Sequence, residues 1–195
     1  EGYIGNVLAE SLLHSGYKIT SFDRLVYNNG ICVMNKFQHP NYTFIYGDIV
    51  SRQELLSAMK GVDAIVLLAG LVGDPITNKF PEEAAKINEY GVRNVIDLCS
   101  EQNIEQLVFI STCSNYGLIE GDTLATETHE LHPLSLYAKA KTSAEDYILS
   151  LKGKTKINPT ILRFATAFGL SPRMRFDLTV SEFTRDLAIG KELLV

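Results

Sequence analysis

Two side chains that could share a proton-transfer step stand four residues apart in the stretch YAKAK, the phenol of Tyr137 and the amine of Lys141. The surrounding segment has helical period, so this spacing places both on one face of a helix. A phenol has an ordinary pKa near ~10, too high for a base at neutral pH, and a nearby ammonium stabilises the phenolate. The pair therefore predicts a general base. Thr112, which ends the apolar run QLVFIST, could hydrogen-bond the same substrate hydroxyl.

The beginning of the chain carries a glycine pattern at the start of an amphipathic segment. Gly2 and Gly5 are three apart, the spacing of a turn that brings main-chain N–H groups and a helix N-terminus against a pyrophosphate. The glycines alone fit a tight turn into a helix equally well. Asp23 ends the next apolar run, near the position of the carboxylate that binds a ribose diol. Together they predict a dinucleotide site and favour NAD; Arg24, which could pair with a 2′-phosphate, keeps NADP open.

The composition narrows the classes of function. The chain of 195 residues is 46% hydrophobic and has a formal net charge of −5, which favours a packed core over disorder. Its lysines and arginines form no run or stripe, so we expect no nucleic-acid partner. No apolar stretch reaches the ~20 residues of a membrane span, so we expect no membrane partner. The three cysteines lack metal-ligand spacing and indicate a reducing compartment, with the cytoplasm as the expected location.

Apolar runs of strand type alternate along the chain with segments of helical period. The runs are nearly continuous in Ile, Val, Leu and Phe, as expected for strands buried on both faces. This alternation predicts an α/β fold, a doubly wound parallel sheet (Rossmann fold) with helices on both faces. The expected strands span 18–23, 43–47, 63–70, 106–112 and 159–164; the expected helices span 4–15, 51–59, 81–102, 136–151 and 177–189; and 24–42 is expected to be a long irregular loop.

The first strand of the fold is missing from this series. In doubly wound sheets that strand lies between the second and the fourth, and without it two inner strand edges would lose their hydrogen bonds. We therefore expect the sequence to be a fragment of a longer protein. On this interpretation, residues 1–195 form an NAD(P)-binding Rossmann domain truncated at both ends, and 170–195 begin a substrate-binding region of which most is absent.

Taken in order, the motifs resemble the extended short-chain dehydrogenase/reductases, specifically the NAD-dependent epimerase/dehydratase group that acts on nucleotide sugars. GYIG is similar to the end of that family's GGxGYIG, and YGD at 46–48 to its adenine-contacting Asp. LLAGL is similar to the stretch along the cofactor, and INEYG to the family's N-x-x-G, whose Asn supports the active site. The resemblance implies a cofactor site made by Gly2, Tyr3, Ile4, Gly5, Asp23, Asp48, Ile49, Leu68, Ala69, Gly70, Asn88, Tyr137 and Lys141.

The same resemblance implies the catalytic roles. ISTCSNYG is similar to the family's Ser/Thr four residues before Tyr-Gly, and LRFATAFG to its LR-x-x-x-x-YG. Thr112, Tyr137 and Lys141 are then the catalytic residues, and a sugar hydroxyl is oxidised to a transient ketone that is reduced again from its other face. We therefore predict an enzyme, an NAD-dependent nucleotide-sugar epimerase whose substrate is a nucleoside-diphosphate sugar. The resemblance also leaves open a homodimer through the two long helices at 81–102 and 136–151.

Departures from the family pattern bear on the reaction. Family dehydratases have Asp-Glu directly after the catalytic Thr, where this chain has Cys113 and Ser114; neither replaces a carboxylate pair, so dehydration is disfavoured. Ala167 replaces a frequent Pro, and Ser181 replaces an Asn that contacts the sugar-nucleotide phosphates. Two alternatives stay open: an NAD(P)-dependent sugar-nucleotide dehydrogenase or reductase of the same fold, and a non-catalytic NAD-binding regulator.

Two further pairs of side chains suggest binding sites, each with a plainer interpretation beside it. His129 and His132 are three apart but lack a clear third ligand, so we expect no metal site. Arg173 and Arg175 follow the last expected strand, where they could clamp a pyrophosphate or lie in a solvated loop.

Overall fold

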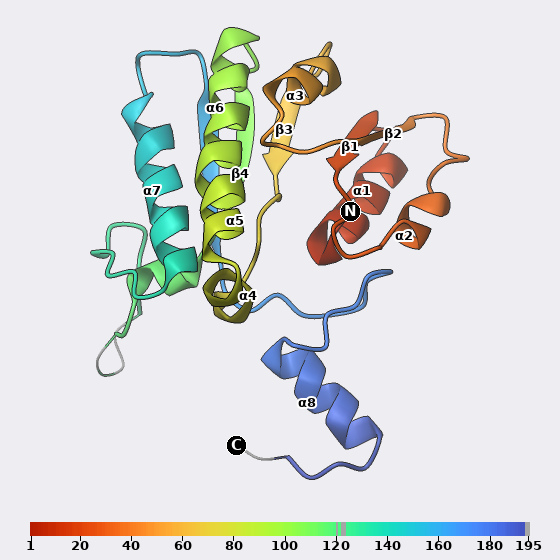
Figure 1. The fold of residues 1–195 in the computed structure, drawn as a ribbon, viewed down its shortest axis with the longest axis vertical. Helices are drawn as coiled ribbons and strands as arrows, with labels where there is room; N and C mark the ends of the chain where they lie inside the picture. The colour runs from red at the N-terminus through yellow and green to blue at the C-terminus, as the bar shows by residue number, and fades with distance from the viewer. Residues whose placement is uncertain (120, 122–123, 194–195) are drawn as a thin grey trace. The chain divides into compact units, whose positions relative to one another are not determined.

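The computed structural model describes residues 1–119, 121 and 124–193, and it shows the alternation of strands and helices that the sequence predicts (Figure 1). The chain divides into two units, Glu1–Tyr46 with Thr166–Val195, and Gly47–Ala165. In the described part of the chain, no helix is both long and apolar enough to cross a membrane.

The first unit contains a pair of parallel strands with helices around them. Its elements are α1 (Tyr3–His14), β1 (Ile19–Asp23), α2 (Ile31–Met34), β2 (Tyr42–Tyr46) and α8 (Thr179–Ala188). Leu13 of α1, Val33 of α2 and Tyr42 of β2 pack together as a core. The prediction of an irregular loop over 24–42 is wrong at α2, because Val33 gains a buried position there and a single helical turn is too short for its period to be seen in sequence.

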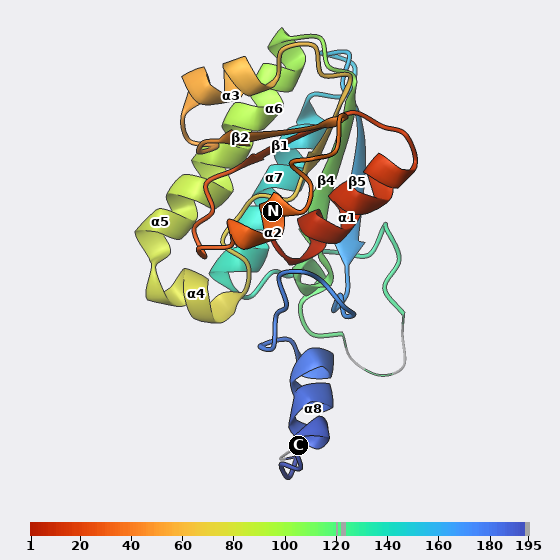
Figure 2. The same ribbon diagram turned by 90° about the vertical axis from the view of Figure 1, so that its right-hand side faces the viewer.

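The second unit contains the remaining strands and the helices that pack on them. Its elements are α3 (Arg52–Ala58), β3 (Ala64–Leu67), α4 (Asp74–Lys79), α5 (Pro81–Ala85), η1 (Lys86–Gly91), α6 (Val92–Glu101), β4 (Gln106–Thr112), η2 (Cys113–Tyr116), α7 (Leu136–Ser150) and β5 (Asn158–Phe164). The strands are parallel in the order β3-β4-β5, with Thr112 of β4 opposite Phe164 of β5. Figure 2 shows α6 and α7 together on one side of β4 and β5.

The strands differ from the prediction in burial. Val66 on β3 and Leu162 on β5 are each 37% exposed, and exposed and half-buried residues alternate along β5. Strands buried on both faces are therefore the wrong expectation for β3 and β5, because α6 and α7 cover the same face of this sheet. Among the described residues, β1 pairs with β2 and β3 pairs with β4 in separate sheets. The central strand ahead of residue 1 stays a prediction.

The helix expected over 81–102 forms as a continuous run of three pieces, α5, η1 and α6. Its middle piece, η1, is a π-helix of six residues, a form that is rare and is frequently found at functional sites. The sequence window KINEYG shows the apolar spacing of a helix but not the wider turn.

Candidate active site

The first turn of α7 holds Tyr137. Ser135 is the N-cap of this helix, and its Oγ accepts a hydrogen bond from the N–H of Ala138 at 3.2 Å. Serine is favoured at this position because its oxygen satisfies an amide that has no partner within the helix. The partial positive charge of a helix N-terminus favours anions in the first turn. Tyr137 therefore lies in the part of α7 where this partial charge acts.

Lys141 lies one turn further along α7 and is almost completely buried, at 5% exposure. Its Nζ donates to the carbonyl oxygen of Ile110 over 2.7 Å and lies 5.8 Å from the ring centroid of Tyr137 and 4.6 Å from that of Phe109. Burial lowers the pKa of Lys141 to about 8, and the negative charge of Glu145 partly opposes that change. The structure thus brings the predicted pair together, with the amine of Lys141 beside the ring of Tyr137.

Thr112 ends β4 as the N-cap of η2. Its buried Oγ1 accepts a hydrogen bond from the N–H of Ser114 and donates to Ser114 Oγ, both at 3.2 Å. The cap fixes the rotamer of Thr112, and rotation of its O–H alone would redirect the donated bond to a substrate hydroxyl. Cys113, the residue after Thr112, is exposed. Neither Cys113 nor Ser114 carries a carboxylate.

A buried carboxylate that the sequence analysis missed lies one turn beyond Lys141. Glu145 is 1% exposed; it accepts hydrogen bonds from Arg163 of β5, from Asn115 of η2, and from the hydroxyl of Ser111 on β4. The hydrogen bonds to Glu145 raise the pKa of Arg163 still further. The spacing 137, 141, 145 on one helix face was the signal that could have identified it.

Asn88, in η1, holds the loop that follows β3. Its Nδ2 donates to the carbonyl oxygen of Leu71 at 2.9 Å, and its Oδ1 accepts from the N–H of Leu71 at 2.8 Å. A Cβ on Gly70 would lie 3.0 Å from Asn88 Oδ1, so the close approach requires glycine. Both ends of the Asn88 amide are thus engaged with main chain. The predicted contact residues Leu68, Ala69 and Gly70 lie in the loop that Asn88 supports.

The loop after β2 is held by the same helical segment. Asn94 of α6 donates through Nδ2 to the carbonyl oxygens of Ile49 and Val50, each at 3.2 Å. Gly91 gives this loop room, because a Cβ there would lie 2.7 Å from Ile49 Cγ1. Asp48 Oδ1 accepts from the N–H of Val50 at 3.1 Å, which orients its carboxylate. Asn94 was missed, since a buried Asn in a helix is not distinguished by its sequence neighbours.

In the first unit, Gly2 is the N-cap of α1 and provides no capping side chain. A Cβ at Gly2 would meet no atom within 4 Å, so the space above this turn is open. The first N–H groups of a helix lack intrahelical partners, and they can bind a phosphate there. Gly5 and Ile4 lie in the first turn of α1. Tyr3 points elsewhere, because its hydroxyl donates to the carbonyl oxygen of Gly169 at 2.6 Å.

Asp23 ends β1 with its carboxylate oriented by main-chain nitrogens. Oδ1 accepts from the N–H of Leu25 at 2.6 Å, and Oδ2 lies 2.7 Å from the main-chain nitrogen of Glu1. Each carboxylate oxygen has a further lone pair, so the group can still accept from two ribose hydroxyls. Leu25 has φ of 52°, a left-handed conformation that is unusual for leucine. Arg24, which lies between Asp23 and Leu25 in the chain, is exposed.

A buried polar cluster under this turn was also missed. Lys36 Nζ lies 3.0 Å from Glu1 Oε2 and donates to Asn6 Oδ1 at 2.6 Å. The hydroxyl of Tyr42 donates to Glu1 Oε1 at 2.6 Å. Burial, together with the carboxylate of Glu1, raises the pKa of Tyr42. These bonds fix the first residues of the chain to β2 and to the segment after α2.

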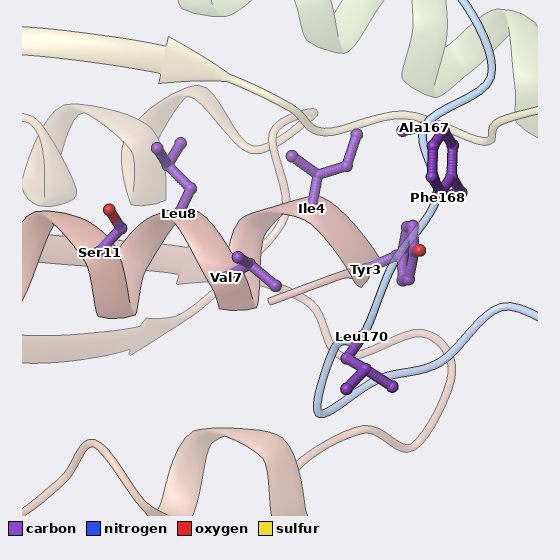
Figure 3. Close-up of a pocket in the computed structure, with 8 residues that line it drawn as sticks. All are labelled: Tyr3, Ile4, Val7, Leu8, Ser11, Ala167, Phe168 and Leu170. Atoms are coloured by element: carbon purple, nitrogen blue, oxygen red, sulfur yellow. The ribbon is translucent and has the colours of Figure 1, made fainter.

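A pocket of about 340 Å³ lies along α1 in the first unit (Figure 3). Figure 3 shows Ser11 at one end and the rings of Tyr3 and Phe168 at the other. Its lining is Tyr3, Ile4, Val7, Leu8, Ser11, Ala167, Phe168 and Leu170. None of the three predicted catalytic residues is among them.

The arginines that follow β5 have partners within the first unit. The guanidinium of Arg173 lies 4.3 Å from the ring centroid of Tyr27. Arg175 donates through Nη2 to Asp177 Oδ2 at 2.6 Å, and this hydrogen bond lowers the pKa of Asp177. Ser181 is buried in α8. A pyrophosphate clamp by these arginines stays a prediction.

His129 and His132 contact different kinds of neighbouring side chain. The ring of His129 meets the ring of Tyr116 edge-on with centroids 5.9 Å apart, and His132 Nε2 lies 3.6 Å from Glu130 Oε2. Within the described residues, no group of three or more His, Cys, Asp or Glu side chains could hold a metal ion.

Comparison with known proteins gives a family match over the whole chain. The model of the NAD dependent epimerase/dehydratase family matches residues 1–195. Among curated proteins, the chain is 31% identical to the uncharacterized UDP-glucose epimerase YtcB of Bacillus subtilis (strain 168), over 100% of this chain and 62% of YtcB. It is 28% identical to the human sterol-4-alpha-carboxylate 3-dehydrogenase, decarboxylating, over 80% of this chain and 39% of that protein. The chain thus spans less than half of the sterol enzyme and under two thirds of YtcB.

The solved structures show the same fold. A UDP-glucuronic acid 4-epimerase from Bacillus cereus, in complex with UDP-glucuronic acid and NAD, superimposes with a TM-score of 0.87 at 24% identity, covering 98% of this chain and 61% of that one. The likeness establishes a Rossmann-like α/β fold with parallel strands.

Proposed function

This chain belongs to the NAD-dependent epimerase/dehydratase family, and on that premise we propose that it is part of an NAD-dependent nucleotide-sugar epimerase. The observation that carries the proposal is the pairing on α7: the amine of Lys141 lies 5.8 Å from the ring centroid of Tyr137 and is bonded to β4 two residues before Thr112. A module that only binds a nucleotide has no use for a phenol beside a buried amine.

The residues of each unit, taken by itself, fit contacts to part of a dinucleotide. In the first unit, α1 begins at an open turn at Gly2, and the oriented carboxylate of Asp23 has lone pairs left for a ribose. In the second unit, two backbone loops, 48–50 and 68–71, are held by Asn94 and Asn88. These residues would hold NAD, which when bound accepts a hydride from a substrate carbon and can return it. NAD is present in the complex of the B. cereus enzyme.

The chain's own residues then handle the proton. Tyr137 takes the proton from a sugar hydroxyl as that carbon is oxidised to a ketone, and gives it back when the ketone is reduced from its other face. Thr112 donates a hydrogen bond to the same oxygen and holds it against Tyr137. With a pKa of about 8, Lys141 is mostly protonated at neutral pH, so its ammonium and the helix N-terminus both stabilise the phenolate.

Loss of water is a poor alternative for this site. The two positions after Thr112 are the exposed Cys113 and Ser114, whose Oγ accepts from Thr112 Oγ1 at 3.2 Å, and neither carries a carboxylate. A net dehydrogenase is the second candidate, because one matched relative is a sterol dehydrogenase and the same three residues serve oxidation alone. The name of YtcB favours a nucleotide sugar.

A homodimer is a further part of this proposal. Tyr90 on η1 and Leu149 on α7 are apolar side chains that are 55% and 52% exposed, on the two long helices that the family resemblance assigns to pairing. Size measurement of the complete gene product, unmodified and with both residues changed to Lys, tests this part; equal sizes would contradict it.

The proposed activity is tested with the complete gene product and its Tyr137→Phe variant. Each is incubated with NAD and a panel of UDP-, GDP- and dTDP-hexoses, with sugars followed by chromatography and reduced cofactor by absorbance. Isomerised sugar without net NADH, lost in the variant, is the expected result. Steady NADH release would establish the dehydrogenase, and no turnover with NAD still bound would favour a binding protein.

A further inference from the structure

Side-chain packing alone does not explain why the carboxylate of Glu145 is buried. It follows Tyr137 and Lys141 at the same four-residue spacing on α7, so the three side chains share one face of the helix. At 1% exposure, its carboxylate has lost its water, and a buried charge is stable only when it is paired and hydrogen-bonded. The hydrogen-bond partners of Glu145 therefore indicate which parts of the structure it holds together.

The partners of Glu145 lie on both sides of Thr112 in the chain. The hydroxyl of Ser111, the residue before Thr112, donates to Glu145 Oε1. The Nδ2 of Asn115, three residues after Thr112, donates to the same oxygen at 2.8 Å and to Ser111 Oγ at 3.0 Å. One carboxylate thus fastens the end of β4 and the start of η2 to α7, and Thr112 lies between the two fastened positions.

The charge of Glu145 is matched by an arginine from the next strand. Arg163 of β5 donates to Glu145 Oε2 through Nη2 at 2.6 Å and through Nε at 3.0 Å. It also donates through Nη1 to the hydroxyl of Tyr116 at 3.1 Å. All the hydrogen bonds at Glu145 are ones that it accepts, as an ionised carboxylate does. The charged or titratable groups facing it are therefore Arg163 from β5, Lys141 from its own helix, and, through Arg163, Tyr116 from η2.

We propose that Glu145 is a positioning residue for the reaction: it fixes Thr112 against the helix that carries Tyr137 and Lys141, and its negative charge favours the ammonium form of Lys141. The inference rests on the catalytic roles given to those three residues in the proposed function. The direction of the Lys141 pKa supports it, since burial lowers that pKa and Glu145 raises it.

Two substitutions separate the effect of the length of the Glu145 side chain from the effect of its charge. Glu145→Gln keeps the length of the side chain and removes its charge. Glu145→Asp keeps the charge and withdraws it by one methylene from Ser111 and Asn115. The readout that needs no turnover is the titration of Lys141 in the complete gene product, followed by NMR with ¹³C in the ε position of lysine and assigned with a Lys141→Arg variant.

The expected pattern differs between the two variants. Glu145→Gln should lower the Lys141 pKa by roughly half a pH unit or more, because an opposite charge nearby favours the ammonium, and the alkaline limb of the activity profile should move down with it. Glu145→Asp should leave that titration nearly in place but lower kcat by roughly 10- to 100-fold, because misplacement of about an ångström is costly to catalysis. KM should change little in either variant.

Two results would overturn the inference: a Lys141 titration that is the same in Glu145→Gln as in the unmodified protein, or a Glu145→Asp variant with unchanged kcat. If Glu145→Gln fails to fold because Arg163 is left without its partner, Glu145→Asp, which keeps the ion pair with Arg163, still tests the positioning role through kcat. Absence of turnover by the unmodified protein would contradict the proposed function and would leave this titration readable.

Discussion

Lys141 donates from Nζ to the carbonyl oxygen of Ile110 over 2.7 Å, so the helix that carries the predicted base is bonded directly to the strand that ends in Thr112. A lysine that only balanced the charge of a phenolate would not need this bond. The contact gives Lys141 two tasks, to hold α7 at a fixed place on β4 and to place its ammonium beside Tyr137. Substitutions of the neighbours of Lys141 should therefore change the position of α7 on β4 and the charge beside Tyr137 separately.

The burial of Lys141 predicts a pH dependence of stability. Its folded pKa of about 8 lies below the ordinary lysine value of 10.5. The unfolded chain therefore binds more protons between these values, and stability rises with pH across that window. Below pH 8 the cost of the buried ammonium is fully present, at most about 3 kcal/mol for this difference in pKa. Lys141→Met should therefore gain more stability in urea unfolding near pH 7 than near pH 10, and the exposed Lys139→Met serves as control; equal gains at both pH values would contradict the prediction.

The hydroxyl of Thr112 should matter more to turnover than to folding. Thr112→Val removes the hydroxyl while keeping the shape, and should lower kcat roughly 100-fold, since a positioned group in proton transfer contributes about that much. The lost cap of η2 should cost only about 1 kcal/mol in unfolding experiments. Thr112→Ser keeps the hydroxyl and should retain most of the activity. Equal kcat for the Val and Ser variants would show that this hydroxyl does not reach the substrate.

Gly91 should tolerate no side chain while Ile49 is present. A Cβ at this position would lie 2.7 Å from Ile49 Cγ1 and 2.8 Å from Cδ1, so Gly91→Ala should cost about 1–3 kcal/mol by overpacking. Ile49→Ala removes both atoms, and the double variant should lose less stability than the sum of the two single variants. A double-mutant cycle by denaturant unfolding measures this coupling, and strict additivity would place the clash elsewhere.

Asp23 should decide the preference between the two nicotinamide cofactors. Its carboxylate is oriented by the N–H of Leu25, so Asp23→Ala should weaken NAD binding roughly 10- to 100-fold, the usual range for a hydrogen bond to a charged group. Binding of NADP should weaken less or improve, because a repulsive charge is removed. Calorimetric titration with both cofactors gives the two ratios, with Arg24→Ala as the matched variant. An unchanged NAD affinity would exclude Asp23 from the ribose contact.

The sequence was most informative where the signal is local. Tyr137 and Lys141 are four apart on a helix whose bounds were predicted to within one residue, 136–151 against Leu136–Ser150, and Thr112 ends a strand predicted to the residue. Both patterns lie within one element, where periodicity is visible. The fold class followed from the same alternation of periods.

The features that escaped prediction depend on partners far along the chain. Glu145 is explained by Arg163, 18 residues away on β5, by Asn115, 30 residues away, and by Ser111, 34 residues away. Asn94 is explained by the main chain of Ile49, 45 residues before it. A buried carboxylate and a solvated one look alike in a helical sequence, because burial is decided by what packs against the helix. The π-turn of η1 was missed for a similar reason, since it shows only in backbone hydrogen bonds.

The direct succession of η1 and α6 has a consequence for how a ligand is held. Asn88 fastens the loop after β3 and Asn94 the loop after β2, and the two residues are six apart on one continuous helical run. Because both anchors lie on one helical run, that run sets the spacing between the two loops. A dinucleotide that contacts both loops would therefore meet contact surfaces that are already in place, which lowers the entropic cost of binding.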